Sequence, residues 1–216
     1  MSTAVQISAG GCVLDADLTK PDASVGVVAF AHGTGSSRHS PRNREVATVL
    51  QDAGLATLLA DLLTPEEEQA DLRTGHLRFD IGLLAGRLVA ITDWLSAEPT
   101  TAGLPVGFFG ASTGGAAALV AAARQPQGVS TVVSRGGRPD LAGADLGAVR
   151  APTLLIVGGR DDVVLGLNQE ALDELRWDKR LEVVPGATHL FEEPGALQTV
   201  AGLARGWFLD HLTPGA

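Results

Sequence analysis

Short runs of apolar residues alternate along the chain with longer segments whose apolar residues recur at helical spacing. From Val25 onward the short runs are almost uninterrupted by polar residues, as in strands covered on both faces of a parallel sheet. The pattern predicts strands over the ranges Val5–Ser8, Cys12–Leu18, Val25–Ala31, Ala56–Ala60, Val106–Gly110, Thr131–Ser134, Thr153–Val157 and Leu181–Val184.

The longer segments are predicted to be helices. The clearest has apolar residues at positions 77, 81, 84, 88, 91 and 95, which lie on one face of a helix. Gly54 follows the first helical segment and is a typical stop signal. The predicted helices are Arg42–Ala53, Leu77–Ala97, Thr113–Ala123, Asn168–Leu175 and Gly195–Leu212.

The alternation of strands and helices predicts an α/β fold with a mostly parallel, doubly wound sheet. The first two strands flank Ala9-Gly10-Gly11, which is a hairpin signal, so the sheet should begin with an antiparallel pair. We see no Pro/Gly-rich linker or repeat, and interpret residues 1–216 as a single domain. Ligands of such sheets bind beyond the carboxyl ends of the strands.

The composition indicates a folded protein and argues against a nucleic-acid-binding or membrane-spanning one. The 216 residues are 45% hydrophobic, as expected of a folded chain, and the formal charge of −9 argues against a nucleic-acid partner. No segment approaches the ~18 uninterrupted apolar residues of a membrane span. The single cysteine, Cys12, excludes an internal disulfide, and the N-terminus lacks the pattern of a signal peptide. We therefore expect a cytoplasmic protein.

The segment Gly110-Ala111-Ser112-Thr113-Gly114 lies where a predicted strand passes into a predicted helix. It fits G-x-S-x-G, in which a nucleophilic serine occupies a strained turn and its neighbours must be small. The free N–H groups at the start of the helix favour developing negative charge. The alternative is an ordinary tight turn rich in small residues, so the remainder of the chain must decide.

A serine nucleophile needs a base that is itself oriented by a carboxylate. The chain offers these groups after separate strands, in the order serine, acid, histidine. Asp161 follows the strand in LLIVGGRDD and is preferred over Asp162 because it lies nearer the strand end. His189 lies in the loop after the last strand, and we assign it as the base.

An oxyanion hole needs two N–H donors. One is expected from the backbone of Thr113, directly after the nucleophile. The other should come from Thr34, in the loop FAHGTGSS at residues 30–37. We assign His32 in this loop a structural role, because it precedes the serine in the chain.

Together these residues resemble the α/β-hydrolase superfamily, and in particular its small dienelactone-hydrolase-like members. The resemblance covers nearly the whole chain and implies a Ser-His-Asp triad, no metal, no organic cofactor, and hydrolysis of carboxylic esters or related acyl compounds. Dienelactone hydrolases proper have a cysteine nucleophile, whereas this chain has Ser112. Many hydrolases of this fold carry a helical cap, but residues 135–152 are too few to form one here.

The substrate is less defined. The loop Asp61–His76 is long for its type and is expected to form a flap, with His76 as a candidate substrate contact, although Glu66–Glu68 fits a solvated helical turn. Arginine suits anions, and Arg135 is the best candidate for binding a carboxylate, unless it pairs with Asp140 or another loop carboxylate. The arginines predicted near strand ends are Arg38, Arg42, Arg44, Arg73, Arg78, Arg135 and Arg138.

The predicted function is a serine hydrolase that cleaves small carboxylic esters or lactones through an acyl-enzyme. Two alternatives stay open: a non-catalytic protein that binds a small molecule on the same fold, and an acyltransferase that uses the same triad. The expected partner is a small acyl substrate, with an anionic substrate and a homodimer as further options.

Overall fold

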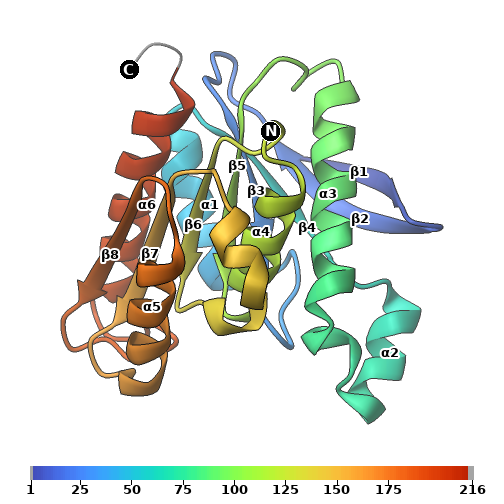
Figure 1. The fold of residues 1–216 in the computed structure, drawn as a ribbon. Coiled ribbons are helices and arrows are strands. Elements are labelled where there is room, and N and C mark those ends of the chain that lie inside the picture. Colours follow the sequence, from blue (N-terminus) through green and yellow to red (C-terminus); the bar gives the residue numbers. More distant parts are fainter. Residues whose placement is uncertain (1, 214–216) are drawn as a thin grey trace.

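A computed structural model describes residues 2–213, and its strands form one eight-stranded sheet (Figure 1). The strand order is β1-β2-β4-β3-β5-β6-β7-β8. Strands β1 and β2 form the expected antiparallel hairpin, and β2 also pairs antiparallel with β4, whereas all later pairs are parallel. The strands are β1 (Ser2–Ala9), β2 (Cys12–Thr19), β3 (Val27–Ala31), β4 (Ala56–Ala60), β5 (Val106–Ala111), β6 (Thr131–Arg135), β7 (Thr153–Gly158) and β8 (Lys179–Val184).

Helices cover both faces of the sheet, so the predicted doubly wound α/β fold is confirmed (Figure 1). One face is covered by α1 and α6, and the other by α3, α4 and α5. The helices are α1 (Pro41–Asp52), α2 (Pro65–Thr74), α3 (Ile81–Ala97), α4 (Thr113–Arg124), α5 (Asp162–Glu174) and α6 (Ala196–Leu212), with 3₁₀ segments η1 (Leu77–Phe79) and η2 (Pro139–Ala148).

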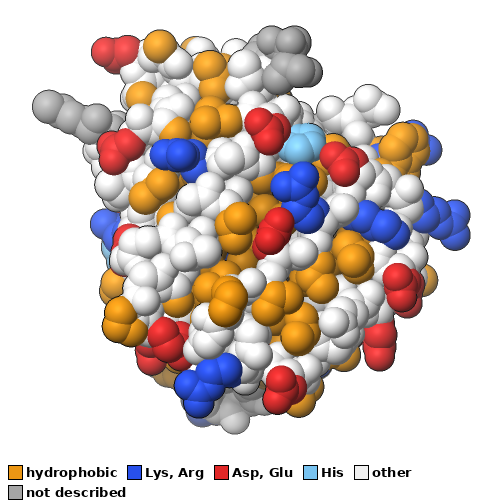
Figure 2. All heavy atoms as spheres, turned by 90° about the vertical axis from the view of Figure 1, so that its left-hand side faces the viewer, with side chains coloured by type: hydrophobic (Ala, Val, Ile, Leu, Met, Phe, Trp, Pro, Cys, Tyr) orange, Lys and Arg blue, Asp and Glu red, His pale blue; other side chains and the backbone are white. Residues whose placement is uncertain are grey.

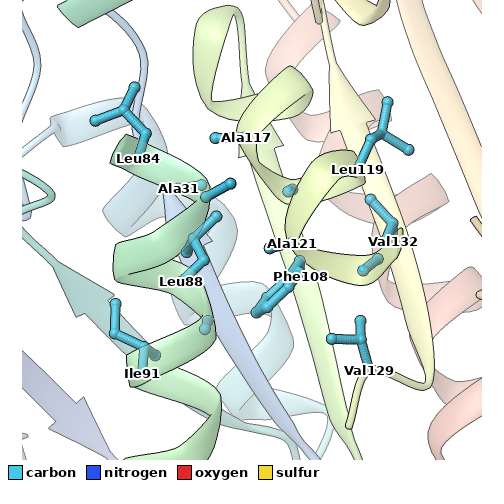
Figure 3. Packing of buried hydrophobic residues seen from close by; sticks show 14 of the residues in the cluster. Ala31, Leu84, Leu88, Ile91, Phe108, Ala117, Leu119, Ala121, Val129 and Val132 are labelled. Atoms are coloured by element: carbon cyan, nitrogen blue, oxygen red, sulfur yellow. The ribbon is translucent and has the colours of Figure 1, made fainter. Parts of the chain in front are cut away.

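Helix α4 connects the core of the sheet to the Ser112 turn. Its first ten residues are all buried, and its alanines let it lie close to the sheet. Ala121 lies beside Phe108 of β5, and Leu88 of α3 belongs to the same buried cluster (Figure 3). This packing fixes the N-terminal end of α4, where Ser112 is located.

Several element ends shift by a few residues from the predicted ones, and the largest differences concern three helical segments. The predicted helix Leu77–Ala97 is divided at Asp80, whose side chain accepts a hydrogen bond from the Leu83 N–H and so starts α3 anew. The helix predicted from Asn168 begins six residues earlier, at Asp162. The loop Asp61–His76 contains α2, begun by a capping box between Thr64 and Glu67, and Glu66 and Glu68 are exposed as expected of a solvated turn.

The connection between β6 and β7 is short and holds only η2, so no cap domain is inserted between these two strands. The carboxyl ends of the central strands β3, β5, β6 and β7 are bordered by their own loops, by the loop after β8 and by α2. Among residues 2–213, no helix is long and apolar enough to cross a membrane.

Candidate active site

Ser112 occupies a strained turn between β5 and α4, with φ 52° and ψ −122°. The turn needs small neighbours. A Cβ on Gly114 would lie 2.1 Å from the Ala31 carbonyl oxygen, and one on Gly110 would lie 2.5 Å from the Gly115 Cα. The start of α4 is thus held against the ends of two strands, as a nucleophile elbow requires.

The hydroxyl of Ser112 does not cap α4. A serine at the N-cap position normally accepts a hydrogen bond from an N–H in the first turn, but the Ser112 side chain makes no such bond. The ordinary turn that the sequence left open as an alternative would use the hydroxyl for this purpose. Here the hydroxyl is half-buried and not used for capping, which favours a chemical role.

Asp161 shows the same feature at the turn from β7 to α5. It is the N-cap residue of α5, yet its side chain makes no capping bond. Instead its Oδ2 lies 2.6 Å from His189 Nδ1. The Asp161 side chain is 15% exposed, whereas Asp162 lies exposed in the first turn of the helix. The geometry thus favours Asp161 over Asp162 as the partner of the histidine.

Hydrogen bonds between residues of the same loop stabilise the loop that carries His189. Glu193 Oε1 accepts hydrogen bonds from the N–H and the hydroxyl of Thr188, at 3.1 and 2.7 Å. The hydrogen bond from the Thr188 side chain makes the largest contribution to lowering the pKa of Glu193, and the bond from the Thr188 N–H lowers it further. Phe191 is fully buried at a φ of 54°, which is uncommon for a side chain of this size. Sequence reasoning missed both residues, because nothing in their spacing shows which way the loop folds.

The end of β6 brings the nucleophile and the histidine together. The Ser112 N–H donates to the carbonyl oxygen of Arg135, at 3.2 Å. A Cβ on the next residue, Gly136, would lie 3.5 Å from His189 Nδ1 and Cε1. Residues 135 and 136 therefore contact both Ser112 and His189 of the predicted triad.

The two threonines predicted to form the oxyanion hole also meet. Thr34 Oγ1 lies 3.2 Å from Thr113 Oγ1, and a Cβ on Gly33 would lie 3.0 Å from Ser112 Cβ. The loop after β3 is thus in contact with the nucleophile turn. Both threonines line the cavity described below.

His32 fixes this loop in place, in keeping with the structural role assigned to it. Its Nε2 accepts a hydrogen bond from the Leu62 N–H at 3.1 Å, and its Nδ1 lies 3.1 Å from the Gly33 carbonyl oxygen. These partners require the neutral tautomer that is protonated at Nδ1. Burial, which leaves only 8% of the residue exposed, lowers its pKa and keeps it neutral.

A cavity of about 280 Å³ opens beside the threonine pair and beneath α2. Leu63, Leu72 and Leu84 supply apolar wall, and Glu68 adds an exposed carboxylate. This volume is at the lower end of the range for small-molecule sites. Helix α2 therefore forms part of the wall over the site, where the sequence predicted a flap.

Arg135 is a buried charged residue that pairs with no carboxylate among the described residues. It is only 8% exposed, and its Nε and Nη1 are buried without a hydrogen-bond partner among the described residues. Its guanidinium lies 5.9 Å from the centre of the Phe191 ring. Burial, together with the charge of Arg42, lowers the pKa of Arg135 to about 10, so that the side chain is still charged at neutral pH.

The other candidate substrate contacts are placed differently. Arg138, not Arg135, pairs with Asp140, at 2.7 Å. His76 is exposed and is not among the residues that line the cavity. Ion pairs with carboxylates are formed by Arg38, Arg42, Arg44, Arg78 and Arg138. Within residues 2–213, no group of three or more His, Cys, Asp or Glu side chains is arranged to hold a metal ion.

The model of the dienelactone hydrolase family matches residues 14–205. The chain belongs to the dienelactone hydrolase family. A crystal structure of a dienelactone hydrolase from Anabaena variabilis is 62% identical and superimposes with a TM-score of 0.97, with 98% of each chain covered. Est1E from Butyrivibrio proteoclasticus is 16% identical, with a TM-score of 0.79 over 96% of this chain and 98% of its own, and shares the fold.

Two curated relatives from Mycobacterium tuberculosis strains are 62% identical over 208 residues and carry the provisional name phosphoribosyl transferase. The match covers 96% of this chain but 46% of each relative. The chain thus spans about half the length of these relatives, and their name describes the longer protein. Membership of the dienelactone hydrolase family and the 62% identity to a dienelactone hydrolase support a hydrolase.

The buried, neutral His32 should make the protein less stable in acid. Its folded-state pKa is lowered, so the unfolded chain binds the extra proton first as the pH falls below about 6.5. The free energy of unfolding should therefore decrease with falling pH in this window. In His32→Gln the slope should be shallower by up to about 1.4 kcal/mol per pH unit. Urea unfolding between pH 7 and 5 measures both slopes, and parallel slopes would refute the assignment.

Asp161→Asn should reduce kcat by about 10⁴-fold if Asp161 orients the catalytic imidazole, because an amide can favour the wrong tautomer. The neighbouring Asp162→Asn serves as the matched control and should change kcat by less than about twofold, since Asp162 is exposed and makes no bond to His189. Steady-state hydrolysis of a chromogenic ester measures both variants. The reverse order of effects would make Asp162 the acid.

Proposed function

We propose that this chain is a serine hydrolase that cleaves small carboxylic esters or lactones. One observation carries the proposal. Ser112 and Asp161 both occupy N-cap positions, where such side chains usually bond to the helix, and neither does so. Asp161 bonds to His189 instead, and Ser112 lies against the Arg135–Gly136 segment that also contacts His189.

In the proposed reaction, Ser112 Oγ attacks the acyl carbonyl carbon and its proton passes to His189 Nε2. Asp161 holds the Nδ1–H side of the imidazole and stabilises its positive charge. The backbone N–H groups of Thr34 and Thr113 hold the oxyanion, each contributing about 3 kcal/mol. The imidazolium then protonates the leaving alcohol, and an acyl-enzyme remains on Ser112.

In the second half of the reaction His189 removes a proton from water, and the resulting hydroxide attacks the acyl carbon. The proton returns to Ser112 Oγ as the carboxylic acid leaves. The cavity of about 280 Å³ beneath α2 suits a short acyl group. An acyltransferase would differ only in the nucleophile of this second step, and a binding protein would not form the acyl-enzyme at all.

An activity-based probe tests the nucleophile directly. A fluorophosphonate should label the wild-type protein at Ser112, and Ser112→Ala should lose the label and nearly all ester hydrolysis. The fold should persist because the change removes one oxygen that makes no capping bond. A binding protein would show no labelling in either form. Undiminished hydrolysis by folded Ser112→Ala would refute the mechanism.

Arg135 is proposed to hold an anionic group of the substrate. The Asp71–Arg78 pair on the cavity wall is mutually neutralised, and Glu68 adds negative charge, so the cavity beneath α2 suits a neutral group. Arg135 instead packs on Phe191, which belongs to the core on the α1 and α6 face. The guanidinium stays charged at neutral pH and forms no ion pair within residues 2–213, so a substrate carboxylate would supply the opposite charge that it lacks.

Arg135→Gln should lower kcat/KM selectively for esters that carry a carboxylate, while neutral esters of the same size should be nearly unaffected. The selective loss should be about 1.5–3 kcal/mol, the range for a hydrogen bond to a charged group. Arg138→Gln is the matched control, because Arg138 pairs with Asp140 nearby in the chain. An equal loss for both substrate types, with lower thermal stability, would assign Arg135 to bracing the loop.

A further inference from the structure

Strand β8 (Lys179–Val184) is the last strand of the sheet and pairs only with β7 (Figure 1). No other part of residues 2–213 adds a strand along its outer side. A free edge of this kind presents unpaired N–H and C=O groups, which readily pair with another chain.

The hydrogen bonds to β7 show which backbone groups of β8 face outward. The Asp178 carbonyl oxygen accepts from the Thr153 N–H, and the Val184 carbonyl oxygen accepts from the Gly159 N–H. Because backbone groups alternate along a strand, even-numbered residues face β7. The N–H and C=O groups of Lys179, Leu181 and Val183 therefore face away from the sheet.

The usual protection of an edge is weak on β8. A lysine side chain often blocks such an edge, but Lys179 Nζ donates to the carbonyl oxygens of Leu172 and Leu175 at the end of α5. The strand contains no proline, and Val183 is 42% exposed. Figure 2 looks onto this side of the molecule and shows exposed hydrophobic side chains between charged side chains of both signs.

Two opposite charges on β8 lack partners of their own. Arg180 and Glu182 lie on the α6 face of the strand, where the Arg180 guanidinium is 5.5 Å from the centre of the Trp207 ring. Neither side chain forms an ion pair within residues 2–213. Both are available to a second chain.

We propose that β8 pairs antiparallel with β8 of a second copy of this chain, about a two-fold axis at Leu181. Leu181 then faces its own copy, and Lys179 faces Val183 of the other chain, with backbone hydrogen bonds exchanged at each pair. The two sheets join into one continuous sheet that has no β8 edge.

The charges select this register over its neighbours. An axis at Leu181 places Arg180 opposite Glu182 at both symmetry-related positions, where side chains of a non-hydrogen-bonded pair come closest. Moving the axis by one residue keeps outward-facing groups paired but sets Arg180 against Arg180, or Glu182 against Glu182. Like charges directly opposite are destabilising, so only the axis at Leu181 is self-complementary.

Light scattering coupled to size-exclusion chromatography tests the proposal. At about 100 µM the protein should have twice the 22.2 kDa mass of one chain. Glu182→Arg should raise the dimer dissociation constant at least about tenfold, because both ion pairs become repulsive. The double variant Arg180→Glu/Glu182→Arg should restore the dimer. Glu66→Arg, the same charge change on α2, is the matched control and should leave it intact.

A backbone variant tests the edge itself. Val183→Pro removes an outward N–H that has no partner within one chain, so the monomer should fold, as circular dichroism would show, and the dimer should be lost. Val183→Thr keeps the N–H and should remain dimeric. A wild-type mass of one chain at 100 µM would overturn the proposal. So would a dimer that survives Val183→Pro or Glu182→Arg.

Discussion

The approach of α4 to the ends of β3 and β5 is the constraint on which the rest of the site depends. Gly114 lies so close to β3 that a Cβ would be 2.1 Å from the Ala31 carbonyl oxygen. In the turn that makes this approach, Ser112 has a positive φ, and its hydroxyl makes no capping bond to the helix. The buried face of α4 holds the strained turn, because moving the helix would open the core around Phe108.

A second constraint is the contact between the β6 end and the loop of His189. The carbonyl oxygen of Arg135 accepts a hydrogen bond from the Ser112 N–H, and its guanidinium lies over the Phe191 ring. Arg135 therefore contacts both the Ser112 turn and the loop that carries His189. Glu193 stabilises the same loop by accepting two hydrogen bonds from Thr188. His189 is therefore positioned by residues that lie outside the proposed triad. Such support allows a catalytic group to keep its geometry on a loop.

Charge is distributed unevenly around the site. The wall beneath α2 combines leucines with a paired Asp71 and Arg78, whereas the unpaired Arg135 lies toward the α1 and α6 face. A substrate that spans Ser112 would meet an apolar wall on one side and a guanidinium on the other. The proposed pairing through β8 involves the far edge of the sheet, and leaves the cavity beneath α2 accessible.

The sequence by itself determined the fold class and the positions of the key residues. Apolar runs marked the parallel strands because these are buried on both faces, and the spacing of Ser112, Asp161 and His189 after separate strands placed all three at one edge of the sheet. The hairpin at Gly10-Gly11 and the absence of a cap domain were also predictable, because both depend on local signals or on chain length.

Only the tertiary structure decided which groups meet. Asp161 and Asp162 are adjacent in sequence, and the start of α5 alone directs one to His189 and the other to solvent. Arg138 pairs with Asp140 while Arg135 is left unpaired, because Arg135 ends β6 with its side chain buried against Phe191, whereas Arg138 lies beyond the strand at the start of η2. The support from Phe191 and Glu193 arises from a loop whose path no periodic pattern describes. Local sequence determines at which point of a strand or loop a residue is located, whereas tertiary packing determines which groups its side chain contacts.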